Sequence, residues 1–207
     1  MNIKENPDFI NTLEQTRQRG KSMARELLLV FSRMGFDVRD ITKHGVICTY
    51  VGDGPEIVAF SQFSPPVFII SEPITPAYLY TSLYTSDEPV KSEVLKELIG
   101  ERYITLVRGF HSDAFLKAKQ ANIMPALVTN LNLLPGTLEP EFVRSALEIL
   151  KPDGLVLISA GNNRDVFEFE RFTNLHFNDY KTHIFTIDDL GFSGISGEAF
   201  LGIFKAL

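Results

Sequence analysis

Cysteine is nearly absent from this chain, and tryptophan is missing altogether. Among its 207 residues there is one cysteine, Cys48. A single cysteine excludes an intrachain disulfide and a metal site built from several cysteines. It is typical of proteins in a reducing compartment, so we expect a cytoplasmic location.

Long apolar runs and excess positive charge are also lacking. No apolar run reaches the roughly 18 residues that a membrane-spanning helix needs, and the N-terminus is too polar for a signal peptide. The net charge is −6, which disfavours nucleic acid as the main partner. The sequence therefore predicts neither a membrane nor a nucleic-acid partner.

The chain does have enough apolar residues for a substantial core. Hydrophobic residues make up 44% of it, including 17 phenylalanines. There is no obvious linker, internal repeat or low-complexity tract. This length and composition suit one domain, or one domain with a helical cap.

Residues 125–161 give the clearest structural pattern, which is strand, loop, helix, tight turn and strand. The two expected strands lack polar alternation, as parallel strands do when both faces are covered. The helix carries an apolar face, and Lys151-Pro152-Asp153-Gly154 is expected to end it. The face consists of Phe142, Val143, Ala146, Leu147 and Leu150. The segment predicts a right-handed βαβ unit.

Further elements follow from periodicity and from turn residues. Strands are expected at residues 67–70, 103–107, 180–187 and 199–206, the last two forming an antiparallel hairpin. Helices are expected at residues 90–99, 113–121 (with Ser112 as N-cap) and 164–173. Residues 75–84 fit a helix or a strand.

The N-terminal segment, from Pro7 to about Met34, is expected to be helical with a break near Gly20. One apolar face contains Met23 and Leu27, and Glu26 is placed on the opposite side with Lys21 and Arg25. The helices could pack on the domain, cap a ligand site or form a dimer surface, and we keep a homodimer as an alternative. We expect an N-terminal helical cap at 1–44 and an α/β domain at 45–207, together one compact unit.

Residues 45–60 have two interpretations. In the first, a strand at 46–51 ends in the glycine loop Gly52-Asp53-Gly54, and Pro55 opens a short helix over 56–63. In the second, Asp53-Gly54 is a hairpin turn that joins 46–51 to 57–60. Both remain open at this point.

The order of elements predicts an α/β protein with a Rossmann-like, mostly parallel sheet. Helices should cover both faces, N-terminal helices precede the sheet, and an antiparallel hairpin ends it. A plain dinucleotide-binding domain does not predict that ending. Residues 146–158, Ala-Leu-Glu-Ile-Leu-Lys-Pro-Asp-Gly-Leu-Val-Leu-Ile, resemble the helix, Leu-Lys-Pro-Gly-Gly turn and fifth strand of class I S-adenosylmethionine-dependent methyltransferases. In this chain Asp153 replaces the first glycine of that turn.

The resemblance implies a set of residues that bind S-adenosylmethionine. Gly52, Asp53 and Gly54 correspond to the family's glycine loop, and Glu56 stands where its last glycine is expected. Glu72, at the end of the second strand, would accept hydrogen bonds from the ribose hydroxyls. His111 and Asp113 would meet the adenine, and Asn130 would close the fourth strand. Asn130 and Asn132 also follow the rule that open α/β sheets bind ligands at the carboxyl ends of their strands.

The expected function is methyl transfer to a small-molecule acceptor. Some members of the superfamily hold a divalent metal with aspartates after the fourth and fifth strands. Here those places are Asn130, Asn132, Asn162 and Asn163, and neutral amides are poorer ligands for hard cations than carboxylates. We therefore expect no catalytic metal. Asn132, His111 and His183 are the candidates for a catalytic group, with Asp165 as an alternative base.

Two other hypotheses stay open. The first is a methyltransferase fold without catalysis that serves as a binding or assembly subunit. The second is a nicotinamide- or nucleotide-binding Rossmann enzyme. Its Gly-x-Gly-x-x-Gly pattern would need glycine where this chain has Ile57, so it ranks last.

Overall fold

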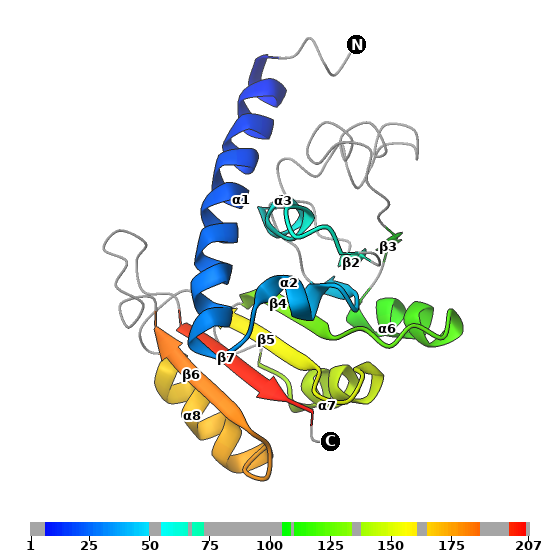
Figure 1. Cartoon of the computed structure of the whole chain (residues 1–207), viewed down its shortest axis with the longest axis vertical. Helices are drawn as coiled ribbons and strands as arrows, with labels where there is room; N and C mark the ends of the chain where they lie inside the picture. Colours follow the sequence, from blue (N-terminus) through cyan, green and yellow to red (C-terminus); the bar gives the residue numbers. More distant parts are fainter. Residues whose placement is uncertain are drawn as a thin grey trace.

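The computed structural model describes residues 7–49, 55–65, 68–72, 105–108, 110–133, 138–160, 165–186 and 199–205. The described strands form one seven-stranded sheet in the order β3-β2-β1-β4-β5-β7-β6 (Figure 1). Their bounds are β1 Val46–Thr49, β2 Phe68–Glu72, β3 Thr105–Arg108, β4 Leu127–Leu133, β5 Leu155–Ala160, β6 Thr182–Thr186 and β7 Ala199–Phe204.

The sheet is parallel except at β7. Strands β3, β2, β1, β4 and β5 pair in parallel, whereas β7 runs antiparallel to both β5 and β6. The mostly parallel sheet and the antiparallel closing pair expected from the sequence are confirmed. Residues 57–60 belong to the helix α3 (Pro55–Ser61) and not to a strand, so the second interpretation of residues 45–60, a hairpin between 46–51 and 57–60, is wrong.

Three helices cover one face of the sheet: α1 (Pro7–Arg33), α2 (Val38–Thr42) and α3 (Pro55–Ser61). The core on this face joins α1 residues such as Leu27 and Phe31 to Ile57 and Phe60 of α3 and to the sheet. Helix α1 crosses the sheet and continues past it beside α3 (Figure 1). Its buried side chains therefore belong to the same core as the α/β domain, while the division at residue 44 stays a prediction.

Helix α1 is continuous through Gly20, so the expected break is wrong. A Cβ atom at Gly20 would lie 2.4 Å from Val58 Cβ and 2.8 Å from the Pro55 carbonyl oxygen. The glycine therefore permits α1 and α3 to approach closely, because any side chain there would collide with α3.

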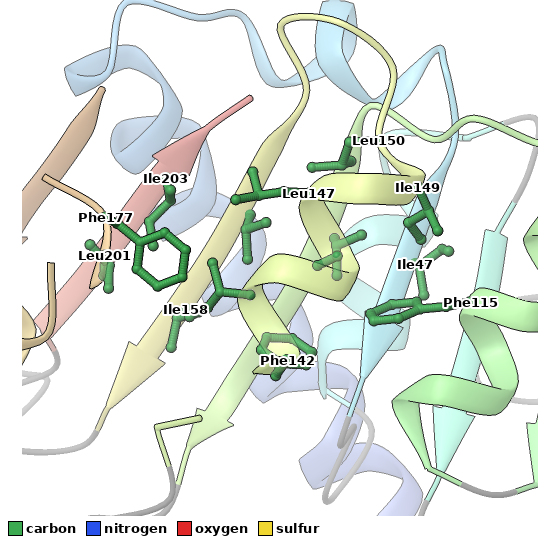
Figure 2. Close-up of a cluster of buried hydrophobic side chains, with 14 of the residues drawn as sticks. Ile47, Phe115, Phe142, Leu147, Ile149, Leu150, Ile158, Phe177, Leu201 and Ile203 are labelled. Atoms are coloured by element: carbon green, nitrogen blue, oxygen red, sulfur yellow. The ribbon is translucent and has the colours of Figure 1, made fainter. Parts of the chain in front are cut away.

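The other face is covered by α6 (His111–Gln120), α7 (Pro140–Ile149) and α8 (Asp165–His176). Figure 2 shows α7 lying over the central strands, with Phe142 and Leu147 directed at the sheet beside Ile158. The βαβ unit of β4, α7 and β5 is thus confirmed, and its apolar face is buried as expected.

The turn that ends α7 explains its own sequence. Asp153 has a φ of +60°, a left-handed conformation that glycine adopts without strain and that aspartate tolerates. The Gly154 N–H donates to the Lys151 carbonyl oxygen at 3.0 Å and closes the turn. Asp153 can thus stand where the family's turn has glycine.

The start of α6 differs from the expectation. The helix begins at His111 and its N-cap residue is Phe110, so Ser112 lies inside the first turn and is not the cap. The Phe110 N–H donates to Asp113 Oδ2 at 2.8 Å. A carboxylate at the third helical position can satisfy the entering backbone in this way.

Several expectations lie outside the described residues. They concern the glycine loop Gly52–Gly54, the segments at 75–84 and 90–99, and Asn162 with Asn163.

Candidate functional site

The strand order places a topological switch point between β1 and β4. From β1 the chain proceeds outward to β2 and β3, and it then returns to β4 on the opposite side of β1. In open α/β sheets the crevice at the carboxyl ends of such a strand pair is the usual ligand site. The short α3 starts at Pro55, close after the carboxyl end of β1, and Glu72 is the last residue of β2 next to it.

Asn130 lies at this edge. We expected it to close the fourth strand, and that expectation is wrong. Strand β4 continues to Leu133, with a register shift against β5 between Asn130 and Leu133. The Asn130 side chain is 3% exposed, and its Oδ1 atom has no hydrogen-bond partner within the described part of the chain. Buried carbonyl oxygens are nearly always hydrogen-bonded, so Asn130 presents an acceptor without a donor at the switch point.

Two hydroxyl groups fasten the carboxyl ends of neighbouring strands. Thr49 Oγ1 donates to the Thr129 carbonyl oxygen at 2.8 Å, joining β1 to β4. Ser159 Oγ donates to the Leu131 carbonyl oxygen at 2.8 Å, joining β5 to β4 across the register shift. These bonds tie the irregular end of β4 to both of its neighbouring strands.

Cys48 lies just below this edge and is chemically quiet. Burial raises the pKa of its thiol, the nearby Thr129 hydroxyl lowers it, and the Glu56 carboxyl raises it further. A thiol that stays protonated is a poor nucleophile. Cys48 is therefore a core residue.

Glu56 is a functional candidate whose burial the sequence did not indicate. It stands in the first turn of α3 and is 2% exposed. The resemblance placed Glu56 only where the last glycine of the cofactor loop is expected, with no prediction of its burial. The side chain turns inward toward Cys48, next to the expected cofactor loop.

His111 is half-buried at the start of α6. Its ring centroid is 5.0 Å from that of Phe142 and 5.5 Å from that of Phe115. Burial lowers its pKa, and the carboxylates of Glu139 and Asp113 partly oppose that effect. The structure thus brings His111 beside the segment that leads from β4 into α7.

His183 lies away from these residues. In β6 it pairs with Gly202, which is in register with Leu157, Thr129 and Cys48 across the sheet. Four strand spacings, about 19 Å, separate β6 from β1. His183 also sits well before the carboxyl end of its strand, with its ring against Phe204. The structure does not bring it together with Asn130 or His111.

The burial of Glu26 differs from what the sequence predicted. We expected it on the outer side of α1, yet it is 5% exposed. It borders a narrow hollow beneath α1 together with Met23, Leu27, Leu131, Ser159 and Phe200. Its spacing along the helix does predict burial, because Glu26 is three residues after Met23 and four before Val30, both on the inner stripe. Its charge had favoured the outer side.

Similarity to solved structures decides the fold. The O-methyltransferase TomG from Streptomyces achromogenes, solved with S-adenosylmethionine and involved in tomaymycin synthesis, matches at a TM-score of 0.60 with 12% identity, over 95% of this chain and 90% of that one. An O-methyltransferase from Bacillus cereus in complex with S-adenosylhomocysteine matches at a TM-score of 0.58 with 13% identity, over 94% and 90% of the two chains. The chain has the class I methyltransferase fold. No protein-family model and no curated protein sequence matches it.

The agreement with these structures concerns the scaffold of the chain. The resemblance found at residues 146–158 lies in α7, the turn and β5, which confirms the scaffold and identifies no catalytic group. In the described residues, no three His, Cys, Asp or Glu side chains gather as metal ligands would. No helix of the same residues is long and apolar enough to cross a membrane.

Proposed function

We propose that this protein transfers a methyl group from S-adenosylmethionine to a small-molecule acceptor without a catalytic metal. The observation that carries the proposal is the fold, which matches structures solved with S-adenosylmethionine or S-adenosylhomocysteine over nearly the whole length of both chains. The switch point between β1 and β4, where open α/β sheets bind ligands, supports the proposal.

The described residues fit such a cofactor. Asn130 Oδ1 is buried at the carboxyl edge without a donor, and an ammonium or hydroxyl group of a ligand would satisfy it. Glu72, at the end of β2, would receive the ribose hydroxyls, because one carboxylate accepts from two donors. Gly52, Asp53 and Gly54, which lie outside the described residues, stay the proposed cofactor-binding loop, and His111 and Asp113 would stand near the adenine.

The reaction requires little chemistry from the protein. S-adenosylmethionine supplies an electrophilic methyl group: a bond forms from the acceptor atom to the methyl carbon, and the electron pair of the broken carbon–sulfur bond stays on sulfur. The chain's own residues bind and orient the two reactants, and this positioning provides much of the rate. Asn130 and Asn132 offer neutral amides, which suits a site without a hard cation.

Calorimetric titration tests the proposal directly. We expect the purified chain to bind S-adenosylmethionine and S-adenosylhomocysteine, and to methylate one or more members of a panel of hydroxyl- and amine-bearing acceptors with undiminished activity in EDTA. No heat of binding with millimolar ligand would contradict cofactor binding. Tight binding without turnover across the panel would instead support the binding or assembly subunit. The cytoplasmic location and the homodimer stay predictions.

A further inference from the structure

Glu26 is a carboxyl group in a place where the scaffold alone would use an apolar side chain. The neighbouring positions of the inner stripe of α1 are apolar, with Leu27, Val30 and Phe31 almost fully buried. Burying a carboxylate without a cationic partner is unfavourable. Within the described residues the structure gives Glu26 one hydrogen-bond partner, the Ser22 hydroxyl, whose Oγ donates to Oε1 at 3.2 Å.

Among the described residues that line the hollow, Glu26 is the only charged one. The hollow is formed by Met23 and Leu27 of α1, Leu131 of β4, Ser159 of β5 and Phe200 of β7. Ser159 uses its hydroxyl hydrogen for the Leu131 carbonyl oxygen, so it does not donate to Glu26. Burial raises the pKa of Glu26, and the Ser22 hydrogen bond partly offsets this. The carboxylate is therefore a stronger base than an exposed one.

The hollow lies beside the expected cofactor position. Leu131 and Ser159 belong to the carboxyl ends of β4 and β5, one strand away from the switch point at β1 and β4. Two turns earlier, α1 touches α3 at Gly20 and Val58. The same helix thus extends from the start of α3, next to the glycine loop, to the hollow that contains Glu26.

We propose that this hollow is the inner end of the acceptor site, and that Glu26 accepts the hydrogen of an aromatic hydroxyl group. The inference rests on the proposed function. The apolar walls and the Phe200 ring suit a flat apolar molecule, and the single carboxylate suits a single acidic O–H. As the acceptor oxygen reacts, its proton passes to a Glu26 carboxylate oxygen, which leaves Glu26 neutral.

With the side chains as they stand the hollow has no room for a ligand, so an acceptor must displace one of its walls. Met23 is the wall that can move, because it is partly buried and packs at the border of the core. Its unbranched side chain has three rotatable bonds and adapts to irregular space. An acceptor would displace Met23 and leave the hydrogen-bonded ends of β4 and β5 in place.

Binding of 4-nitrophenol in the presence of S-adenosylhomocysteine tests the role of Glu26 without any turnover. We expect the parent protein to bind this probe, and Glu26→Gln to bind it about 10- to 100-fold more weakly, the effect of losing a hydrogen bond to a charged group. The ligand 4-nitroanisole, which has no hydroxyl hydrogen, should bind the two proteins equally. Equal affinity for 4-nitrophenol, or no binding to the parent, would overturn the proposal.

The exposed Glu14→Gln on the same helix is the matched control, since Glu14 is 52% exposed. It should leave the affinity for 4-nitrophenol unchanged. A loss in Glu14→Gln as large as that in Glu26→Gln would also overturn the proposal, because it would reflect the charge of α1 and not the hollow.

The pH dependence of binding keeps the proposal testable if Glu26→Gln folds poorly. The ionised carboxylate is the stronger acceptor, so affinity should fall as the pH is lowered through the raised pKa of Glu26. Ser22→Ala removes the hydrogen bond that lowers that pKa, and should move this fall to higher pH. An unchanged profile in Ser22→Ala would refute the assignment.

Failure of this inference is distinguishable from failure of the proposed function. S-adenosylhomocysteine should bind the parent and Glu26→Gln with the same affinity, because Glu26 is placed at the acceptor and not at the cofactor. If S-adenosylhomocysteine fails to bind the parent, the methyltransferase proposal fails. If it binds and the 4-nitrophenol data do not depend on Glu26, only the role of Glu26 fails.

Discussion

Asn130 combines a structural disadvantage with a functional position. Its buried Oδ1 has no hydrogen bond from the described residues, and leaving such a group unsatisfied costs about 1–3 kcal/mol. The sheet does not need a polar residue at this position, because neighbouring strand positions such as Val128 and Ile158 are apolar. A ligand that donates to Asn130 would recover part of that cost.

We therefore predict opposite effects of Asn130→Leu on stability and on binding. The free energy of unfolding should rise by about 1 kcal/mol, since an apolar group of similar shape removes the unsatisfied oxygen. Affinity for S-adenosylmethionine should fall about 10-fold or more. Urea denaturation and calorimetry measure the two quantities, with the exposed Asn174→Leu on α8 as control. A variant that is less stable and binds normally would contradict this role.

The sequence was most misleading for single polar residues. Glu26 was assigned to solvent because of its charge, although its spacing from Met23 and Val30 fits the inner stripe of α1. Glu56 was assigned only to the position of the last glycine of the cofactor loop, and nothing in the sequence indicated that it is buried. Polarity predicts exposure on average, whereas a fold can bury polar groups where it binds a ligand.

At the scale of elements, the contact between α1 and α3 sets the position of the N-terminal helix. Gly20 lies against Val58 and the Pro55 carbonyl oxygen. At another buried glycine, Gly202 of β7, an added Cβ would lie 2.8 Å from the Met34 Sδ atom and 3.3 Å from Leu155 Cδ1. The first neighbours are Cβ and backbone atoms and cannot rotate away, while the second are ends of flexible side chains.

Replacing each glycine with alanine should separate these cases. Gly20→Ala should lower the free energy of unfolding by about 1–3 kcal/mol, because overpacking outweighs the gain of about 1 kcal/mol in helix propensity. Gly202→Ala should change it by less than about 1 kcal/mol. Thermal or urea denaturation provides the comparison, with exposed Lys21→Ala as a helix control. Equal losses in the two glycine variants would show that the approach of α1 to α3 is not rigid.

Elements with strong local patterns were predictable, and those fixed by distant contacts were not. The βαβ unit of β4, α7 and β5 follows from apolar runs and the Lys-Pro-Asp-Gly turn. The supposed break at Gly20 was wrong because a glycine in a helix can serve a close contact, and Val58 is 38 residues away. Helix α2, at Val38–Thr42, was missed because five residues carry too little periodicity.

The fold class itself emerged from the order of elements. Alternating strands and helices followed by an antiparallel pair predicted the sheet that the structure shows, and the turn at residues 151–154 pointed to the same fold. The candidate site was less accessible, because its residues come from separate strands and meet only through the sheet. Register places Asn130 and Thr49 at one edge and His183 far from it, which spacing along the chain could not show.

Two buried groups give the whole molecule a predictable pH dependence of stability. Burial raises the pKa of Glu26, so the folded state holds that proton to higher pH than the unfolded state does. The resulting stability is complete below the ordinary carboxyl pKa and is lost as the pH rises through the raised one. Burial lowers the pKa of His111, so its contribution is complete above the ordinary histidine pKa and is lost as the pH falls.

The variant Glu26→Gln should isolate the first effect. Its free energy of unfolding, minus that of the parent, should increase as the pH rises from the ordinary carboxyl pKa through the raised pKa of Glu26. Urea denaturation at a series of pH values measures this difference. Parallel curves for the two proteins would contradict a raised pKa at Glu26. The Glu14→Gln control should stay parallel to the parent.

The insertion of β7 between β5 and β6 constrains how the chain can fold during synthesis. Strand β6 precedes β7 in the chain, yet β7 is its neighbour in the sheet and separates it from β5. Until residues 199–204 leave the ribosome, β6 has no strand to pair with, and β5 presents an open edge. Such edges favour association with other chains. The nascent protein should therefore be most prone to association with other chains until β7 is made.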